Sequence, residues 1–286
     1  ILIAALMYAL QLYADFSAGI DISRGIAQIL GIDMAQNFRR PYFSRSISEY
    51  WRRWHITLGA WMKDYLFYPI ATSSMFMGIS KRIKGTKFGK TKAGAHVAKV
   101  LATSVASLVV FFIVGIWHGA NTKYVAFGLW NGGIIMLSTL LKPCFDFVRI
   151  KLRIKETNPF FIAFQLIRTF VVVLVGYYFD IAPNAKGAIV MMYRSLTSLN
   201  VRLGLRQILT LQFRLNDCII LFFCTAIMLL VSIIQERASD ASIRVMLDKR
   251  SVVVRWGVIF VAIMAVILLG VYGPGYNQAD FVYGQF

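Results

Sequence analysis

Residues Val100–Leu141, VLATSVASLVVFFIVGIWHGANTKYVAFGLWNGGIIMLSTLL, contain a single lysine, Lys123, and no arginine or acidic residue. The stretch holds two uncharged runs, Val100–Trp117 and Tyr124–Leu141, each close to the roughly 20 apolar residues that cross a bilayer as a helix. The short connection between them contains His118 and a glycine, which suits a turn. The stretch therefore predicts a membrane hairpin with a histidine at its tip.

The composition of the whole chain agrees with a membrane protein. Its 286 residues are 58% hydrophobic and only 15% charged, against roughly 45–50% apolar and 25% charged in a soluble domain. The net charge of +18 would suggest nucleic acid in a soluble protein. In a membrane protein such an excess usually marks cytoplasmic segments and contacts with anionic lipid, so we predict a lipid bilayer and no nucleic acid as partner. The three cysteines have no metal-ligand spacing, and we predict no metal site.

Further apolar runs predict additional membrane helices. Cys218–Gln235 and Trp256–Ala279 are uncharged, Pro159–Phe179 is interrupted only by Arg168, and Ile1–Ala14 resembles the end of another span. We predict about six membrane helices in total. The chain opens with Ile1–Leu6, without a starting methionine, a basic segment or the cleavage site of a signal peptide, so we expect it to be the interior of a longer protein whose earlier helices are missing.

Two basic segments predict the orientation. Residues 72–99 are expected to form a basic cytoplasmic loop, and Lys142–Lys155 should lie on the same side, with the His118 turn on the far side. Continuing this count places Ser232–Arg255 inside and Phe286 outside. Residues 186–214 are then predicted outside although they carry several cations. Two interpretations stay open there: an interfacial amphipathic region, or an error in the topology.

The segment around His55 has the pattern of an amphipathic helix. Ser46 followed by Glu49 is typical of a capping box at a helix start. At about 100° per residue the apolar side chains share one stripe with His55, while Arg52 and Arg53 lie opposite. Such a helix is expected at the cytoplasmic interface rather than across the membrane. The members of the stripe are Trp51, Trp54, His55, Leu58, Trp61, Met62 and Tyr65.

Each histidine has a functional and a structural interpretation. An ionisable residue at membrane depth is costly, and histidine is the usual general base, so His55 and His118 are candidate catalytic residues. Alternatively, His55 is a core residue and His118 is a turn residue bonded to a neighbouring carbonyl. His96 lies within the basic segment and is expected to be solvated.

The polar residues after the first apolar run also have two interpretations. Asp21 is expected to pair with Arg24 three residues later on one helix face. Asp15 has no such neighbour and is either a polar residue of helix packing or part of a substrate cavity. Asn37–Tyr42, NFRRPY, is predicted to be a loop, because Pro41 disfavours the helical region for the preceding residue; it is otherwise a basic interfacial turn.

Taken together these motifs resemble the membrane-bound O-acyltransferase family. They are most similar to its bacterial branch, which contains the alginate O-acetylation protein and the D-alanyl-lipoteichoic acid transferase. The similarity is dense over residues 8–70 and 111–133, and the closing residues 281–286 resemble the end of those proteins. The motifs that carry it are Tyr13–Ile22 (YADFSAGIDI), Asn37–Tyr42, Ser44–Leu58 (SRSISEYWRRWHITL), Lys63–Leu66 (KDYL) and Gly115–Ala120 (GIWHGA).

The resemblance implies an all-α integral membrane protein of the bacterial plasma membrane. It implies a multi-helix bundle with interfacial amphipathic helices, in which residues 1–286 form a single acyltransferase domain. His118 matches the near-invariant histidine of the family and His55 the second conserved histidine. The residues expected to bind substrate, with the Trp54 indole or the Asn121 amide as donor to the oxyanion, are Trp54, Trp117, Asn121, Asp15, Asp21, Asn37, Arg52 and Arg53.

The resemblance also implies the substrates. An acyl thioester, on coenzyme A as in acetyl-CoA or on an acyl carrier protein, would arrive from the cytoplasm, and a polymer hydroxyl from the opposite side. No bound cofactor is expected. A carrier protein and an extracytoplasmic acyltransferase are possible partners. Because the basic segment 71–99 is long, unlike that of the D-alanyl branch, we favour O-acetylation of a polysaccharide over D-alanyl transfer.

The sequence departs from the family pattern at two places. Ile20 follows Gly19 where the family has an aromatic residue, and Arg39 stands where a second asparagine is common. These changes concern substrate choice more than reaction type. Two other classes stay open. A transporter would be expected to show internal repeats, of which we find none that convinces, and a non-catalytic docking or assembly subunit would tolerate loss of the histidines.

Overall fold

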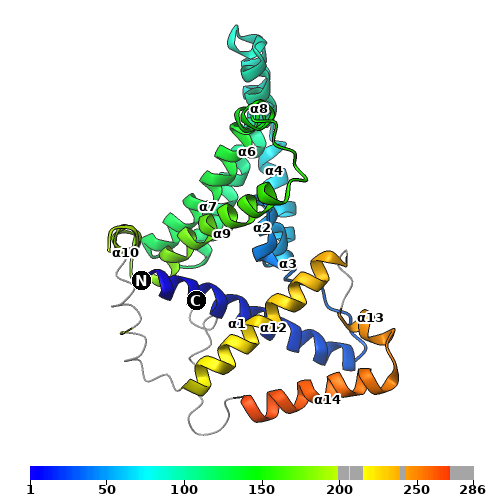
Figure 1. Cartoon of the computed structure of the whole chain (residues 1–286). Helices are drawn as coiled ribbons and strands as arrows, with labels where there is room; N and C mark the ends of the chain where they lie inside the picture. Colours follow the sequence, from blue (N-terminus) through cyan, green and yellow to red (C-terminus); the bar gives the residue numbers. More distant parts are fainter. Residues whose placement is uncertain (199–205, 207–214, 239–242, 271–286) are drawn as a thin grey trace. The chain divides into compact units, whose positions relative to one another are not determined.

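The computed structural model describes residues 1–198, 206, 215–238 and 243–270 (Figure 1), and every regular element within these ranges is a helix. Contacts between residues that lie close in space divide the chain into two units. The first is made chiefly of residues 1–199 and the second of residues 200–285. The predicted organisation of residues 1–286 as a single domain is not tested by this division. The two units are described separately.

The first unit contains the hairpin and the motifs around both candidate histidines. Its elements are α1 (Leu2–Ile29), the 3-10 turn η1 (Pro41–Phe43), α2 (Ile47–Arg53), α3 (Ile56–Met62), the π-helix η2 (Lys63–Phe67), α4 (Tyr68–Ala71), α5 (Ser74–Gly85), the 3-10 turn η3 (Phe88–Lys90), α6 (Lys92–Trp117), α7 (Thr122–Leu140), α8 (Lys142–Lys151), α9 (Pro159–Ile181) and α10 (Ala185–Thr197). The second unit contains α12 (Leu215–Arg237), α13 (Ile243–Asp248) and α14 (Val252–Leu269).

Five of the described helices are long and apolar enough to cross a membrane: α1, α6, α9, α12 and α14. The pair formed by α7 and α8 passes the same test together, with a bend of 57° between them, which raises the total to six. The prediction of about six membrane helices is confirmed, and the chain is an all-α, multi-pass membrane protein. The apolar run that begins at Trp256 forms α14, while its end, from residue 271, lies outside the described residues.

Helices α6 and α7 form the expected hairpin and approach each other closely through glycines. A Cβ atom on Gly115 of α6 would lie 2.3 Å from the carbonyl oxygen of Tyr124, and one on Gly128 of α7 would lie 2.3 Å from that of Phe111. No side chain fits at either distance, so the two backbones are in contact. Among membrane helices, where lipid offers no hydrophobic drive, such small-residue contacts are a main source of packing.

Helix α9 closes this hairpin on one side. The indole Nε1 of Trp130 in α7 donates to the carbonyl of Val172 in α9 at 3.0 Å. Gly176 of α9 leaves room for the same tryptophan, since a Cβ there would lie 3.6 Å from its Cδ1. The contact between α7 and α9 therefore consists of a large aromatic side chain packed against a glycine.

Helix α1 joins this core through a chain of tyrosine hydroxyls. Tyr42 donates to the carbonyl of Ala9 at 2.6 Å, so it accepts from Tyr177 at 3.2 Å. Tyr177 has then used its single hydrogen, and Tyr50 donates to it at 2.7 Å. Because the chain ends on a helix carbonyl of α1, it ties α1, η1, α2 and α9 together.

The basic segment 72–99 is helical rather than a loop, which corrects our expectation. Helix α5, η3 and the first turns of α6 occupy it, and Thr91 caps α6 by accepting from the Gly94 amide at 3.0 Å. His96 was expected to be solvated, but it is half-buried and its Nε2 lies 3.0 Å from the Thr139 carbonyl of α7. The cause is the hairpin, which brings the end of α7 beside the start of α6.

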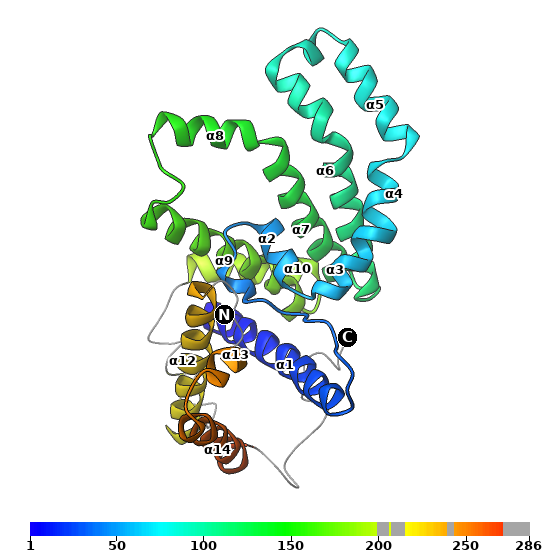
Figure 2. The same cartoon turned by 90° about the vertical axis from the view of Figure 1, so that its right-hand side faces the viewer.

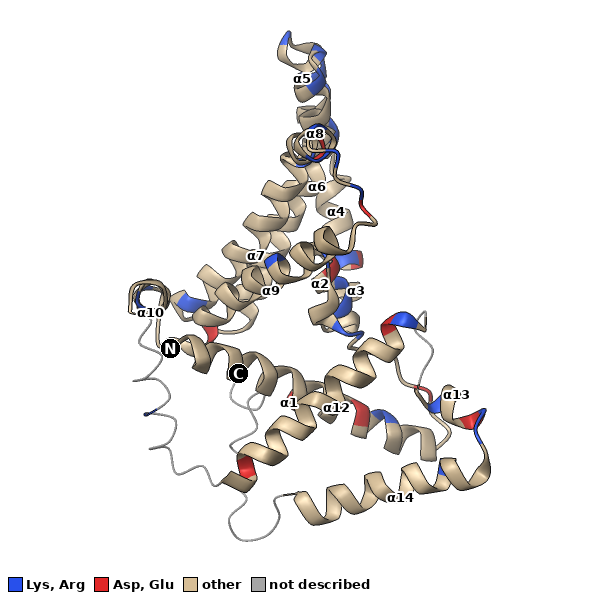
Figure 3. Ribbon diagram, viewed as in Figure 1, with Lys and Arg blue, Asp and Glu red and all other residues tan. Residues whose placement is uncertain are grey.

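The two basic segments lie at the same end of the hairpin, opposite the turn with His118. Figure 2 shows α5 and α8 at the end where α6 begins and α7 finishes, and Figure 3 shows Lys and Arg gathered there. This arrangement agrees with a shared side for both segments. Which side of the membrane that is stays a prediction.

Other predictions fall partly outside the described residues. Helix α10 covers Lys186 and Arg194, but Arg202 and Arg214 of the ambiguous segment 186–214 are not described. The closing motif 281–286 is likewise outside the described ranges. The side assigned to residues 186–214 and to the chain end therefore stays a prediction.

Replacing Gly128 tests whether the glycine contact holds the hairpin. We expect Gly128→Val to lower the free energy of unfolding by about 1–3 kcal/mol or more, since overpacking displaces the backbone of α6. The matched control is Gly133→Val in the same helix, where an added Cβ meets nothing within 4 Å. Thermal unfolding in detergent measures both variants, and equal losses would contradict a specific contact.

Candidate active site

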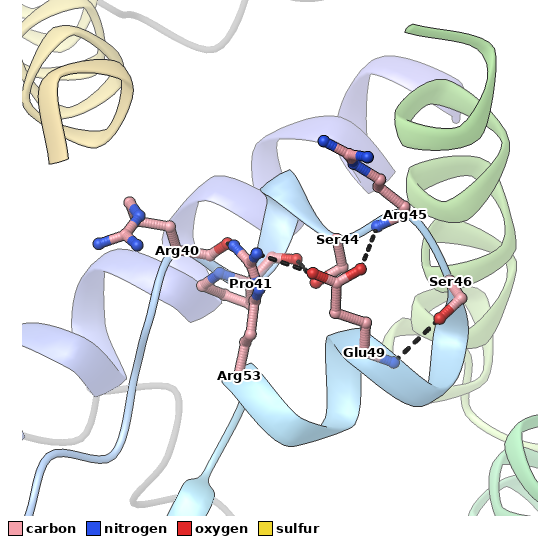
Figure 4. A network of polar contacts seen from close by, with 7 residues as sticks. All are labelled: Arg40, Pro41, Ser44, Arg45, Ser46, Glu49 and Arg53. Carbon is pink, nitrogen blue, oxygen red and sulfur yellow. Dashed lines mark hydrogen bonds and ion pairs between the residues drawn. The ribbon is translucent and has the colours of Figure 1, made fainter. Parts of the chain in front are cut away.

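The start of α2 is fixed by a network around Glu49 (Figure 4). Ser46 accepts from the Glu49 amide at 3.2 Å, which confirms the predicted cap. The Glu49 carboxylate accepts from the Arg45 amide at 2.8 Å and from Arg53 Nη2 at 2.7 Å. Arg53 also donates to the Arg40 carbonyl at 3.4 Å. The Arg53 guanidinium, which was expected to bind substrate, is thus held at the end of α2 in a partly buried ion pair.

The predicted helix through Trp51–Tyr65 is broken at His55, which corrects our expectation of one continuous stripe. His55 has φ 45° and ψ 56°, the left-handed region, and precedes α3 as its N-cap. This conformation costs roughly 1–3 kcal/mol in a residue other than glycine and persists only where neighbours impose it. The chain therefore turns sharply between α2 and α3, and His55 lies at the corner.

Residues of the NFRRPY loop impose this turn. The Asn37 carbonyl accepts from the Ile56 amide at 3.0 Å, and the Arg39 amide donates to the Arg53 carbonyl at 2.9 Å, so the loop is fastened on both sides of His55. The Asn37 side-chain oxygen lies 3.1 Å from His55 Nδ1. The prediction of a loop is confirmed for residues 37–40, which are not helical, while Pro41 and Tyr42 begin the 3-10 turn η1.

Aromatic rings enclose the corner. Trp54 is buried and its ring lies 5.0 Å from that of Phe38, edge to face, and stacks on Tyr50 at 5.7 Å. The ring of Phe16, from α1, meets the His55 imidazole edge to face at 5.0 Å. Such pairs contribute about 0.5–1.5 kcal/mol each beyond their buried area. They hold the imidazole between α1 and the loop.

Trp51 docks this corner on the hairpin. Its indole Nε1 donates to Asn131 Oδ1 of α7 at 3.1 Å, and the Asn131 amide donates back to the Phe127 carbonyl at 2.9 Å. Asn131 is 2% exposed, and a buried amide needs partners of this kind. Asn131 was not among the site residues predicted from the sequence. The available signal was an asparagine inside an apolar run, directly after Trp130.

His118 follows the last turn of α6 and lies among aromatic rings. Its imidazole is half-buried, 6.1 Å from the Tyr124 ring in a stacked arrangement and 5.9 Å from the Phe127 ring. Gly119 permits the approach of Tyr124, because it has φ 145° and a Cβ there would lie 2.9 Å from the tyrosine ring. The Phe127 ring also lies 6.1 Å from Trp51, so it connects both histidine motifs.

The two histidines are electrostatically coupled and favour the neutral form. Burial lowers the pKa of His55, and burial followed by the charge of His55 lowers the pKa of His118 to about 4. Each imidazole is therefore neutral at pH 7 and can act as a proton acceptor.

A largely apolar cavity of about 470 Å³ adjoins His55 between the α2–α3 corner and the hairpin. Arg52 and Lys63 contribute cations to its wall, and the π-helix η2 forms part of it, a distortion often found at functional sites. The cavity can take an apolar or partly polar chain with an anionic group at the rim. Its lining residues include Ser48, Trp51, Trp54, His55, Leu58, Gly59, Met62, Phe67, Ser107, Val110, Phe111, Val114 and Ile135.

Other predicted site residues lie elsewhere in the first unit. Asn121 caps α7 by accepting from the Lys123 amide at 3.1 Å and donates to the Pro183 carbonyl at 3.0 Å. Asp21 is exposed and forms the expected ion pair with Arg24 at 3.4 Å. Asp15 is half-buried on α1, and Trp117 is 54% exposed beside His118. Substrate contacts of these residues stay predictions.

Comparisons with known proteins identify relatives of this chain, although no family model matches it. The chain is 35% identical over 130 residues to the probable alginate O-acetylase AlgI of Pseudomonas syringae pv. tomato, which is 46% of this chain and 21% of that protein. It is 34% identical to the peptidoglycan O-acetyltransferase of Helicobacter pylori over 128 residues, 45% of this chain and 20% of the relative. It is 25% identical to the teichoic acid D-alanyltransferase of Bacillus subtilis over 174 residues, 60% and 38% respectively.

These matches span only about a fifth to two fifths of the length of the relatives. All of the relatives are members of the membrane-bound O-acyltransferase family. The resemblance seen in the motifs is therefore supported by aligned sequence over about half of the chain.

The lowered pKa of His118 predicts how the stability of the protein depends on pH. The unfolded state, with a histidine pKa near 6.5, binds the proton first as the pH falls. The stability contributed by neutral His118 is thus present above about pH 6.5 and is lost as the pH falls toward 4, up to about 3 kcal/mol. His118→Gln, which does not titrate, should lose correspondingly less stability over this range in detergent unfolding. Identical pH profiles of the variant and the wild type would contradict the buried, neutral imidazole.

Proposed function

We propose that this chain carries the histidine-bearing part of a bacterial membrane-bound O-acyltransferase, the family that its relatives represent. It moves an acyl group, acetyl in the first instance, from a cytoplasmic thioester donor to a hydroxyl of an extracytoplasmic polysaccharide or cell-envelope polymer. The observation that carries the proposal is that the motifs of His55 and His118, far apart in sequence, meet at the Phe127 ring, which contacts both Trp51 and His118, while His55 lines the cavity. The protein acts in the plasma membrane.

In the proposed reaction the thioester lies in the cavity beside His55. The His118 imidazole takes the hydroxyl proton as the acceptor oxygen attacks the thioester carbonyl carbon. The tetrahedral intermediate collapses, the carbon–sulfur bond breaks, and the thiolate leaves and takes up a proton. His55 positions the thioester, and the Trp54 indole is the preferred donor to the oxyanion because it lines the cavity, whereas the Asn121 amide is held by Pro183.

Charge at the cavity rim suits an anionic donor. Arg52 is exposed and lines the cavity together with Lys63, while Arg53 is held by Glu49. Arg52 and Lys63 are therefore the cations that we assign to the phosphates of coenzyme A or of a carrier-protein prosthetic group. A carrier protein and an extracytoplasmic acyltransferase are proposed partners.

The comparisons support acetyl as the transferred group. The chain is 34–35% identical to relatives named as O-acetylating proteins and 25% identical to one named as a D-alanyltransferase. This difference favours acetyl transfer. D-alanyl transfer to teichoic acid is the second candidate, supported by the longer matched segment of that relative, 174 residues.

Separate His118→Ala and His55→Ala variants of the full-length protein test the enzyme. We expect His118→Ala to reduce acyl transfer to the polymer by a factor of about 10³ or more and His55→Ala by about 10–10³, since a positioned base contributes about 10²–10⁴. His96→Ala is the matched control, because His96 bonds to Thr139 at the other end of the hairpin. Transfer that survives in both site variants would refute the catalytic role and favour a transporter or assembly subunit.

Filling the cavity tests where the donor binds. Gly59 of α3 lines the cavity and has ordinary space at its Cβ, 3.6 Å from the nearest atom, so Gly59→Leu should fill the cavity and keep the fold. We expect the KM for the thioester donor to rise about tenfold or more. The control is Gly78→Leu in α5, outside the cavity, where a Cβ meets nothing within 4 Å. An unchanged donor KM in Gly59→Leu would place the donor elsewhere.

A further inference from the structure

The side chain of Asn37 is bound to the segment that carries His55 by three contacts to one atom. Its Oδ1 lies 3.1 Å from His55 Nδ1, 3.2 Å from the Thr57 amide nitrogen and 2.6 Å from Thr57 Oγ1. Asn37 is 9% exposed, so its side-chain amide is largely shielded from bulk solvent. An amide with this many local partners is placed to orient its neighbours rather than to contact a substrate.

The Thr57 amide shows which atom of the Asn37 side chain makes these contacts. A backbone N–H can only donate, so the Asn37 atom that faces it must be the oxygen and not the side-chain nitrogen. His55 Nδ1 faces the same acceptor and must therefore carry a hydrogen. In a neutral imidazole the hydrogen on Nδ1 leaves Nε2 with the lone pair.

We infer that Asn37 is a positioning residue that holds His55 in the Nδ1–H tautomer and leaves Nε2 as the hydrogen-bond acceptor for the substrate. This inference rests on the proposed function and changes the expected role of Asn37 from substrate contact to control of the imidazole. Because His55 lines the cavity while Nδ1 is taken by Asn37, Nε2 is the nitrogen that remains for a ligand there.

The surroundings keep the ring in this orientation. The Phe16 ring packs edge to face on the imidazole at 5.0 Å, and the left-handed backbone of His55 is fixed by the main chain of Asn37, which accepts from the Ile56 amide at 3.0 Å. The ring is thus oriented by the side chain of Asn37 and the backbone by its main chain. A change of the side chain alone leaves the backbone bond in place.

The tautomer can be read directly by nitrogen NMR of the full-length protein labelled with ¹⁵N-histidine in detergent. Subtracting the spectrum of His55→Gln assigns the His55 signals. We expect the wild type to show a protonated Nδ1 and an unprotonated Nε2 on His55, and Asn37→Ala to show a mixture that includes the Nε2–H form. The kcat for acyl transfer should fall roughly 10- to 100-fold in Asn37→Ala, the range found for residues that orient a metal-bound histidine.

Two further variants separate positioning from general damage. Thr57→Val removes the hydroxyl contact but keeps the amide donor, so the tautomer of His55 should stay as in the wild type. Asn37→Asp keeps an acceptor at Nδ1 and adds a negative charge, which raises the pKa of His55 and should move the acidic limb of the kcat profile to higher pH. The charged or titratable groups around His55 are His118, on the hairpin, and Arg52 and Lys63, which share its cavity.

The outcomes distinguish the inference from the proposed function. A wild-type His55 with Nε2–H, or an Asn37→Ala spectrum equal to that of the wild type, overturns the inference whatever the activity. An altered tautomer in Asn37→Ala together with unchanged kcat overturns the catalytic importance of that tautomer. Failure of the proposed function is seen separately, as acyl transfer that survives the histidine variants.

Discussion

Direct contact between the backbones of α6 and α7 at Gly115 and Gly128 is the constraint on which the rest of the first unit depends. It fixes which face of α7 lies beside α6, and so which side chains the hairpin offers to its neighbours. Phe127 and Asn131 lie on the same helix as Gly128, one turn or less away, and their environment is set by this approach. Replacing either glycine therefore changes more than the hairpin itself.

The second tie is polar and runs from the hairpin to the corner between α2 and α3. Trp51 reaches Asn131, and Asn37 reaches the His55 ring and the Thr57 amide, so two buried amides connect segments about 80 and about 18 residues apart. In a largely apolar setting a buried amide is costly without a hydrogen-bond partner. Even two such bonds therefore specify how these segments pack. Together these bonds place the His55 corner against the helix that carries Phe127, whose ring contacts His118.

The sequence predicts the elements well where a single local property decides them. The hairpin, the spans and the Ser46 cap follow from runs of apolar residues and from one hydroxyl at a helix start. The break at His55 could not be predicted in this way, because the periodicity of Trp51–Tyr65 is helical throughout. The left-handed turn is imposed by Asn37, which belongs to a separate loop. The helical elements in residues 72–99 were not predicted, because the many cations of this segment were taken to indicate a loop.

In the candidate site, too, local features were predicted and contacts between distant segments were not. The histidines could be named from their motifs. The contacts that engage the neighbouring polar residues could not be predicted. Arg53 and Asn121 were expected to meet substrate, yet Glu49 and Pro183 engage them, and Asn131 was not named at all. These differences depend on contacts across 4 to about 80 residues, which a single sequence does not reveal.

The most direct test of this account is a cryo-electron microscopy map of the full-length protein with a thioether analogue of acetyl-CoA, whose carbon–sulfur bond next to the reacting carbon does not break. We predict density for the pantetheine arm in the cavity lined by Trp51, Met62 and Val110, with the reacting carbon beside His55 and facing His118. Density for the analogue in a different cavity, away from both histidines, would contradict the assignment of the active site.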